Sequence, residues 1–306
     1  MTVFAGVTNA ELKPMGDMEL SQQVGQAAIA FDVTEVDNTS QTRFTFGSTI
    51  DTQLNIDNFT LGEYENPAST SGADVEIANM SLGHISDAGA IVPFEARNPY
   101  FEIAEKNGEL VGFRMGFDEA RGSLSGDIST FSGNLGIKVI DGSGVERTPS
   151  LMDAENNATN YRATQLGVIV SPPPPEDPTP IAEQPAGPAV PSDPTFPDDP
   201  EMPADLAPPP VAPLPPRLVT TQLSEFKTLD VGELDANGVA QFTKDFFFSF
   251  QKEEVTWQGK SGSAPIQAGV GVHFNIPTSM VLTMPQFEAG VPRARTEYID
   301  RGLGLF

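Results

Sequence analysis

The stretch NPYFEIAEKNGELVGFRMGF, residues 98–117, predicts an antiparallel β-hairpin. Apolar and polar residues alternate in both halves, as they do in strands that turn one face to a core. The Asn-Gly pair favours the left-handed backbone of a two-residue hairpin turn, which places the turn at Lys106-Asn107-Gly108. The apolar positions are Phe101 and Ile103 before the turn and Val111, Phe113, Met115 and Phe117 after it. The stretch therefore favours an all-β fold.

Further short strand patterns lie on the N-terminal and C-terminal sides of this hairpin, separated by Gly, Asn, Asp and Ser. NIDNFTLG (55–62) superposes on EIANMSLG (76–83) with a spacing of 21 residues, and a looser copy lies at 122–139. Repeats of this length are typical of β-solenoid coils, while consecutive hairpins in a β-sandwich or roll explain the same alternation equally well. Under the repeat assignment, we expect the equivalent residues Ile56 and Ile77 to face the core.

Residues 171–216, SPPPPEDPTPIAEQPAGPAVPSDPTFPDDPEMPADLAPPPVAPLPP, hold 19 of the 28 prolines. Eight carboxylates and no lysine or arginine lie between Glu176 and Asp205. Proline fixes φ and removes a backbone donor, and like charges repel one another. The stretch therefore predicts a disordered, extended linker rather than the interior of a domain.

This linker predicts two β domains, residues 11–170 and residues 217–306, each long enough for a core of its own. The second part again shows strand-like segments, in VTTQLSEFKTLDVGEL, VAQFTKDFFFSF, EEVTWQG, IQAGVGVHFNI and SMVLTM. Residues 1–10 are apolar and small, like the remnant of a signal peptide, with processing expected at their end. A short helix is expected at about Met18–Gln23, and a strand within AAIAFDVTEV.

The charge of the chain argues against two classes of partner. The formal net charge is −25, and the 17 lysines and arginines are scattered. Nucleic acid and anionic lipid both require basic patches, so neither is expected as a partner. The chain has no cysteine, which excludes disulfides and Cys-ligated zinc. No apolar run approaches the roughly 18 residues of a spanning helix, so no transmembrane span is expected.

The sequence contains no catalytic motif, and we do not expect an enzyme. Of the two histidines, His84 lies beside Ser86 and Asp87 in a turn, and His273 alternates with apolar residues of a strand. Members of a catalytic triad converge in space rather than in sequence, so SLGHISDAG is interpreted as a turn. No cofactor is expected, but Asp and Asn recur at 32–38 and 51–58, which are candidates for a structural calcium site.

The segment Phe242–Phe250 carries three consecutive phenylalanines. Alternation in a strand places Phe246, Phe248 and Phe250 on one face and Phe247 on the other. Either a second layer of the same domain covers Phe247, or Phe247 contacts another subunit. Phe247 is therefore the candidate interface residue.

Two stretches carry a resemblance to a known family. LKPMGDMELS followed after three residues by GQA, within residues 11–30, resembles a leader of exported Gram-negative surface proteins. Residues 98–139 resemble the core of the Fil-type family of pilus or filament surface proteins of Gram-negative bacteria. The matching positions are Asn98, Pro99, Gly112, Phe113, Arg114, Gly116, Gly126, Asp127, Gly133 and Asn134. The resemblance covers roughly residues 11–139, less than half of the chain.

The resemblance implies export across the inner membrane to an extracellular or cell-surface location. It also implies a structural role as a subunit or accessory of a pilus or filament in adhesion or biofilm. The expected partners are proteins, either further copies of the chain or other filament components. The alternative is a periplasmic or outer-membrane-associated protein that tethers or binds a partner.

Overall fold

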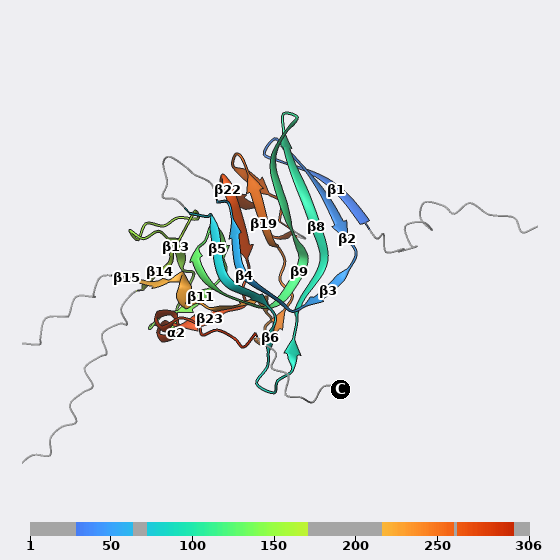
Figure 1. The fold of residues 1–306 in the computed structure, drawn as a ribbon. Coiled ribbons are helices and arrows are strands. Elements are labelled where there is room, and N and C mark those ends of the chain that lie inside the picture. The colour runs from blue at the N-terminus through green and yellow to red at the C-terminus, as the bar shows by residue number, and fades with distance from the viewer. Residues whose placement is uncertain (1–28, 64–71, 171–215, 260–261, 297–306) are drawn as a thin grey trace, which may run out of the picture.

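The computed structural model describes residues 29–63, 72–170, 216–259 and 262–296, which form an all-β protein (Figure 1). The expected signal-peptide remnant, the helix at Met18–Gln23 and nearly all of the Pro-rich segment lie outside the described residues. The expected strand within AAIAFDVTEV is confirmed as β1 (Ile29–Val36).

The largest sheet has eleven strands, most of them paired antiparallel, with one parallel pair between β10 (Gly133–Leu135) and β22 (Gly271–Ile276). Its main path is β1 (Ile29–Val36), β2 (Thr39–Phe46), β8 (Phe94–Lys106), β9 (Glu109–Thr130), β19 (Phe246–Gln251), β22 and β10. Four strands branch from it: β3 (Thr49–Thr52), β4 (Leu54–Leu61), β5 (Val75–Leu82) and β16 (Thr228–Val231). The long strand β9 joins the main path to β5 and β16, because its first half pairs with β8 and β19 and its second half with β5 and β16, whereas β3 pairs with β8.

The remaining elements flank this sheet. One three-stranded sheet has the order β12 (Glu146–Arg147), β11 (Lys138–Ile140), β23 (Val281–Thr283). A second has the order β13 (Ser150–Met152), β14 (Gln165–Val170), β15 (Arg217–Gln222). The strand pairs are β17 (Glu233–Leu234) with β18 (Ala240–Gln241), β20 (Val255–Trp257) with β21 (Ile266–Ala268), and β6 (His84–Ile85) with β7 (Ile91–Val92). The described helices are η1 (Leu223–Glu225) and α2 (Met284–Ala289).

The expectation of two separate β domains is corrected by the strand pairing. Strand β19 pairs with β9, and β15 pairs with β14 along its whole length, so both pairings join residues before 171 to residues after 216. A single core cluster contains Phe94 and Phe131 from the first part and Phe226 and Phe274 from the second. Neither part contains the main sheet or this core cluster complete, because both parts contribute strands and side chains to them.

The hairpin predicted at 98–117 is confirmed. Lys106 of β8 is paired with Glu109 of β9, which leaves Asn107 and Gly108 as the turn. Both have positive φ, 55° and 80°, as a two-residue turn of this hand requires. β8 and β9 extend well beyond the predicted stretch and form the longest hairpin in Figure 1.

The repeated segments are not solenoid coils. Solenoid coils stack in parallel, whereas NIDNFTLG and EIANMSLG form β4 and β5, which pair antiparallel, with Phe59 opposite Ile77. Ile77 also lies opposite Ile128 of β9, so the third copy continues the same sheet. Ile77 is fully buried as expected, but Ile56 is only partly buried, because β4 has a strand neighbour on one side alone in the described residues.

Three aspartates build the same kind of turn in the flanking hairpins. Each accepts backbone N–H groups of the second and fourth following residues through Oδ1, which satisfies donors that the turn would otherwise leave unpaired. The turns begin at Asp141, Asp153 and Asp235. These hydrogen bonds hold the pKa of each carboxyl below its ordinary value, at about 2 for Asp141, whose largest contribution comes from the Ser143 hydroxyl.

Across the described ranges, no helix combines the length and the apolar character needed to cross a membrane.

Candidate functional site

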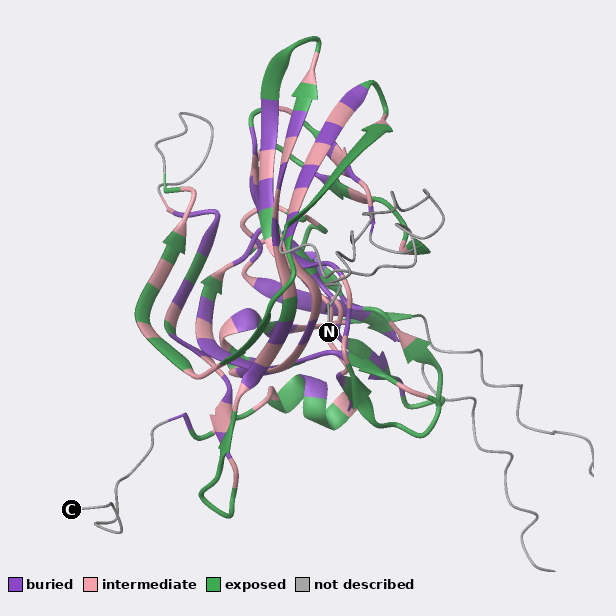
Figure 2. Cartoon of the chain, turned by 90° about the vertical axis from the view of Figure 1, so that its right-hand side faces the viewer, coloured by how far each residue is buried: buried purple, intermediate pink, exposed green. Residues whose placement is uncertain are grey.

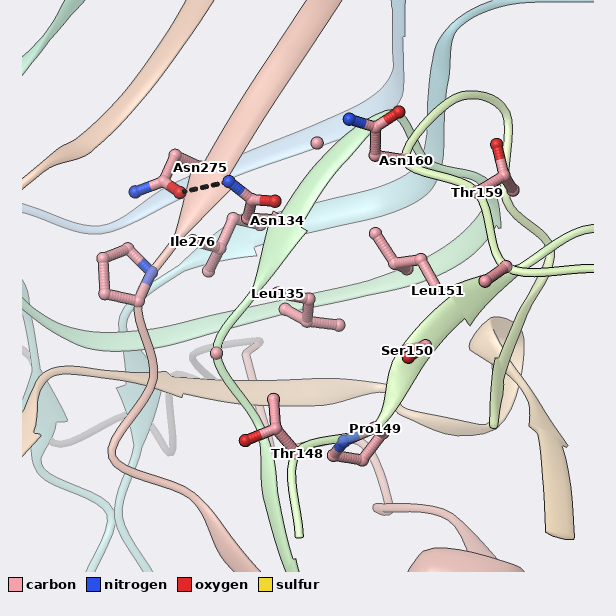
Figure 3. A pocket seen from close by; sticks show the side chains of 14 residues that line it. Asn134, Leu135, Thr148, Pro149, Ser150, Leu151, Thr159, Asn160, Asn275 and Ile276 are labelled. Carbon is pink, nitrogen blue, oxygen red and sulfur yellow. Dashed lines mark hydrogen bonds between the residues drawn. The ribbon is translucent and has the colours of Figure 1, made fainter. Parts of the chain in front are cut away.

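A cavity of about 700 Å³ opens where β10 and β22 meet the loop before and after β13 (Figure 3). Its apolar surface comes from Leu135, Leu151 and Ile276, and its polar groups come from asparagine, serine and threonine side chains. None of its lining residues is charged, which is unusual for a chain with a net charge of −25.

Glycine sets the position of the cavity wall. Gly133 has φ 143°, and a Cβ atom there would lie only 1.9 Å from the carbonyl oxygen of Phe274. Only glycine therefore allows β10 to approach β22 closely enough for the parallel pairing of Asn134 with Asn275. This close approach places the two asparagine side chains at one edge of the cavity (Figure 3).

Hydrogen bonds fix these asparagines. Asn134 Nδ2 donates to Asn275 Oδ1 at 3.3 Å and lies 3.3 Å from His273 Nε2, while Asn275 Nδ2 donates to the carbonyl of Asp245 at 2.6 Å. Burial lowers the pKa of His273 to about 4, so its ring is neutral at pH 7, and in the tautomer with its proton on Nδ1 it accepts from Asn134 through Nε2. Fixed amides, hydroxyls and an apolar base can hold a small neutral ligand through hydrogen bonds and packing.

A group of buried charges lies further along the same face of the sheet, beyond His273 and Phe247. Glu102 accepts hydrogen bonds from Arg114 Nε at 2.5 Å and Arg43 Nη2 at 3.1 Å, and all three side chains are at most 6% exposed. The Arg114 guanidinium lies 4.9 Å from the ring centres of both Phe247 and Trp257. The β20–β21 hairpin covers this group, so the charges stabilise the contact between the hairpin and the sheet.

Phe247 belongs to this covered layer. It is on the opposite face from Phe246 and Phe248, as alternation predicts, but its side chain is 0% exposed and packs with Tyr100, Val255 and Trp257. The interface assignment for Phe247 is therefore wrong: a second layer of the same fold covers it. The residue does not reach the surface where another subunit could contact it.

Glycines at positions that carry the family resemblance have a structural role. Added Cβ atoms at Gly112, Gly116 and Gly126 would lie 3.1 Å from the Trp257 ring, 2.3 Å from the carbonyl oxygen of Phe246 and 2.4 Å from Ile77. These positions allow close packing against β9, and Gly133 does the same at β10.

The structure brings a histidine and a serine that are distant in the sequence within hydrogen-bond distance of each other. His84 Nδ1 lies 3.0 Å from Ser123 Oγ, and Asp230 is the strand partner of Ser123. A nucleophilic serine must be reached by its substrate, whereas Ser123 is 3% exposed. The pair therefore links β6 to β9. Sequence analysis missed this contact because it joins residues 39 positions apart.

In the part of the chain that the structure describes, no three His, Cys, Asp or Glu side chains are grouped to hold a metal ion. The segments 32–38 and 51–58, which carry the calcium candidates, form parts of β1, β3, β4 and the first hairpin turn.

The outer strand β1 is the most exposed strand of the main sheet. Seven of its eight residues are exposed, and Figure 2 draws them in green. Three of these are large and apolar: Ile29, Phe31 and Val33 are each more than 50% exposed. In the described residues its only strand neighbour is β2, so one edge of β1 has no strand beside it.

No family model matches the chain, and neither a curated protein nor a solved structure is detectably similar to it.

Proposed function

We propose that the chain is an exported cell-surface protein with a structural role, a subunit or accessory of an extracellular pilus or filament in adhesion or biofilm. The observation that carries the proposal is the exposed apolar edge of β1, with Phe31 60% exposed. Soluble proteins normally protect such an edge, because its unpaired N–H and C=O groups pair readily with another chain. The resemblance of residues 98–139 to Fil-type surface proteins supports the same role.

The proposal is tested in cells that produce the full chain. Protein released from the surface by shearing is compared with the periplasmic fraction, and the sheared material is viewed by negative-stain microscopy. We expect the chain in the sheared fraction and fewer filaments when Phe31→Ser replaces the wild type. Val239→Ser serves as the control, because Val239 is 54% exposed but lies in the β17–β18 turn. A strictly periplasmic chain, or unchanged filaments in cells without the protein, would contradict the proposal.

The uncharged cavity favours a second candidate, a periplasmic or outer-membrane-associated binding protein. Fixed amide groups beside apolar side chains suit a neutral ligand that carries hydroxyl or amide groups, such as a saccharide. A panel of neutral mono- and disaccharides should then raise the melting temperature of the wild type and not of Asn134→Leu. No shift with any sugar would contradict this candidate.

A further inference from the structure

One apolar layer runs across six strands from the core to the edge of the main sheet. The strand register places one residue of each strand in a continuous row: Phe31, Phe44, Phe101, Met115, Phe248 and Phe274. Three rings touch in succession at the β1 end of the row, with centroids 5.3 Å apart for Phe31 and Phe44 and 4.7 Å apart for Phe44 and Phe101. A second row, two residues further along β1, begins with Val33 and ends with Val272.

The two ends of these rows differ in exposure, and the residues between them are partly buried or, at Met115, just exposed. Phe274 is 3% exposed, Met115 is 37% exposed and Phe31 is 60% exposed. In the second row Val272 is 3% exposed and Val33 is 56% exposed. The described residues therefore cover one end of the layer and leave large apolar side chains exposed at the other, where burial would be favourable.

The edge of β1 lacks two of the usual protections. Its sequence, IAFDVTEV, contains neither lysine nor proline. With eight residues it is also longer than the short edge strands that protect other sheets from pairing. An added strand would gain backbone hydrogen bonds, and its side chains on the apolar face would continue the rows that begin with Phe31 and Val33.

The charged residues of the β1–β2 hairpin indicate which kind of chain would bind this edge. The exposed charged residues of the β1–β2 hairpin are Asp32, Glu35 and Asp37, all acidic. The hairpin's one basic residue, Arg43, is 6% exposed and pairs with Glu102. A second copy of β1 would bring carboxylates against carboxylates, and each copy carries a formal charge of −25. Like charges across a strand pair are destabilising, whereas opposite charges are stabilising.

We propose that the β1 edge binds an extended segment of a different protein, with apolar residues at alternate positions and lysine or arginine between them. The apolar residues would cover Phe31 and Val33, and the basic residues, on the opposite face of the strand, would meet Asp32. The inference rests on the proposed function only in taking a protein as the partner.

The probe is a blocked octapeptide of alternating valine and lysine, and the matched control is its valine–glutamate counterpart. Binding of each labelled peptide to the full chain is measured by fluorescence anisotropy. We expect the lysine peptide to bind, the glutamate peptide not to bind, and the affinity to fall as salt is added. Phe31→Ser should weaken binding about tenfold or more, while Val239→Ser should leave it unchanged.

A charge exchange gives the sharpest outcome. Asp32 is exposed and lies on the face that the lysines of the peptide would occupy, so Asp32→Lys should keep the fold, which circular dichroism checks. This variant should bind the glutamate peptide and lose the lysine peptide.

Four results would each overturn the inference: no binding of either peptide to the wild type, equal binding of both, an unchanged preference in the exchanged variant, or sedimentation that shows self-association through β1. Binding that appears only after residues 1–28 are deleted would also overturn it, because the chain's own N-terminal segment would then be the occupant. Failure here leaves surface localisation intact, and failure of the filament role leaves peptide binding intact, so the two are distinguishable.

Discussion

Glu102→Gln should destabilise the fold strongly although it changes few atoms. Glu102 is the carboxylate between Arg43 and Arg114, whose side chains are 6% and 0% exposed. Glutamine keeps the shape but removes the negative charge, which leaves two guanidinium groups buried with less compensation. Breaking a buried ion pair by neutralising one partner costs about 3–5 kcal/mol. Asp118, 3.7 Å from Arg43 Nη1, offsets part of this loss, so we expect a value near 3 kcal/mol, roughly the lower end of that range.

The matched control is Glu119→Gln. Glu119 pairs with Arg97 at 3.1 Å in the same β8–β9 hairpin, but the two side chains are 40% and 46% exposed. An exposed pair contributes about 0–1 kcal/mol. Both variants are unfolded in urea and followed by the fluorescence of Trp257, the only tryptophan, which lies 4.9 Å from the Arg114 guanidinium. If Glu102→Gln loses no more stability than Glu119→Gln, the buried charge group does not stabilise the fold as argued.

The other stability predictions use the same unfolding assay. Ile77→Asp should cost several kcal/mol and Ile56→Asp clearly less, because Ile77 is fully buried and Ile56 only partly; equal effects would count against this assignment of the β4–β5 pair. Phe247→Ser should cost about 3–5 kcal/mol, and a variant as stable as the wild type would reopen the interface assignment. His273 has its pKa lowered by burial from 6.5 to about 4, so the unfolded chain binds a proton before the native chain does as the pH falls. Stability should therefore decrease between pH 6.5 and about 4, by at most about 1.4 kcal/mol per pH unit, and His273→Gln should flatten this part of the profile.

Local chemistry could be predicted from the sequence. The Asn107-Gly108 turn depends on backbone conformations that these residues adopt easily, so the β8–β9 hairpin was predictable from its own residues. The sides of β19 were also predictable, because alternation alone separates Phe247 from Phe246 and Phe248.

The long-range arrangement could not be predicted in this way. The pairing of β9 with β19 joins residues more than a hundred positions apart, and neither strand carries a local pattern that identifies its partner. The alternation of polar and apolar residues also places Glu102 and Arg114 on the polar side of their strands. The side chains on such a face are expected to be exposed to solvent. The structure instead covers that side with the β20–β21 hairpin, so the polar face is the more deeply buried one.

The two candidate surfaces could not be predicted from the sequence either, because each depends on the long-range arrangement of the strands. The cavity combines β10, β22 and two loops, so no single segment of the sequence indicates it. The edge position of β1 depends on which strands lack a neighbour, and that becomes visible only when the whole sheet is known.

The shared core is tested most directly by cutting the chain between its two parts. A specific protease site inserted between Pro191 and Ser192 allows one cut in the native protein, followed by size-exclusion chromatography without denaturant. Because β9 pairs with β19 and β14 with β15, the two fragments should elute together at the volume of the uncut chain and separate only in guanidinium chloride. Two fragments that separate under native conditions, each with its own cooperative melting transition, would contradict a single fold.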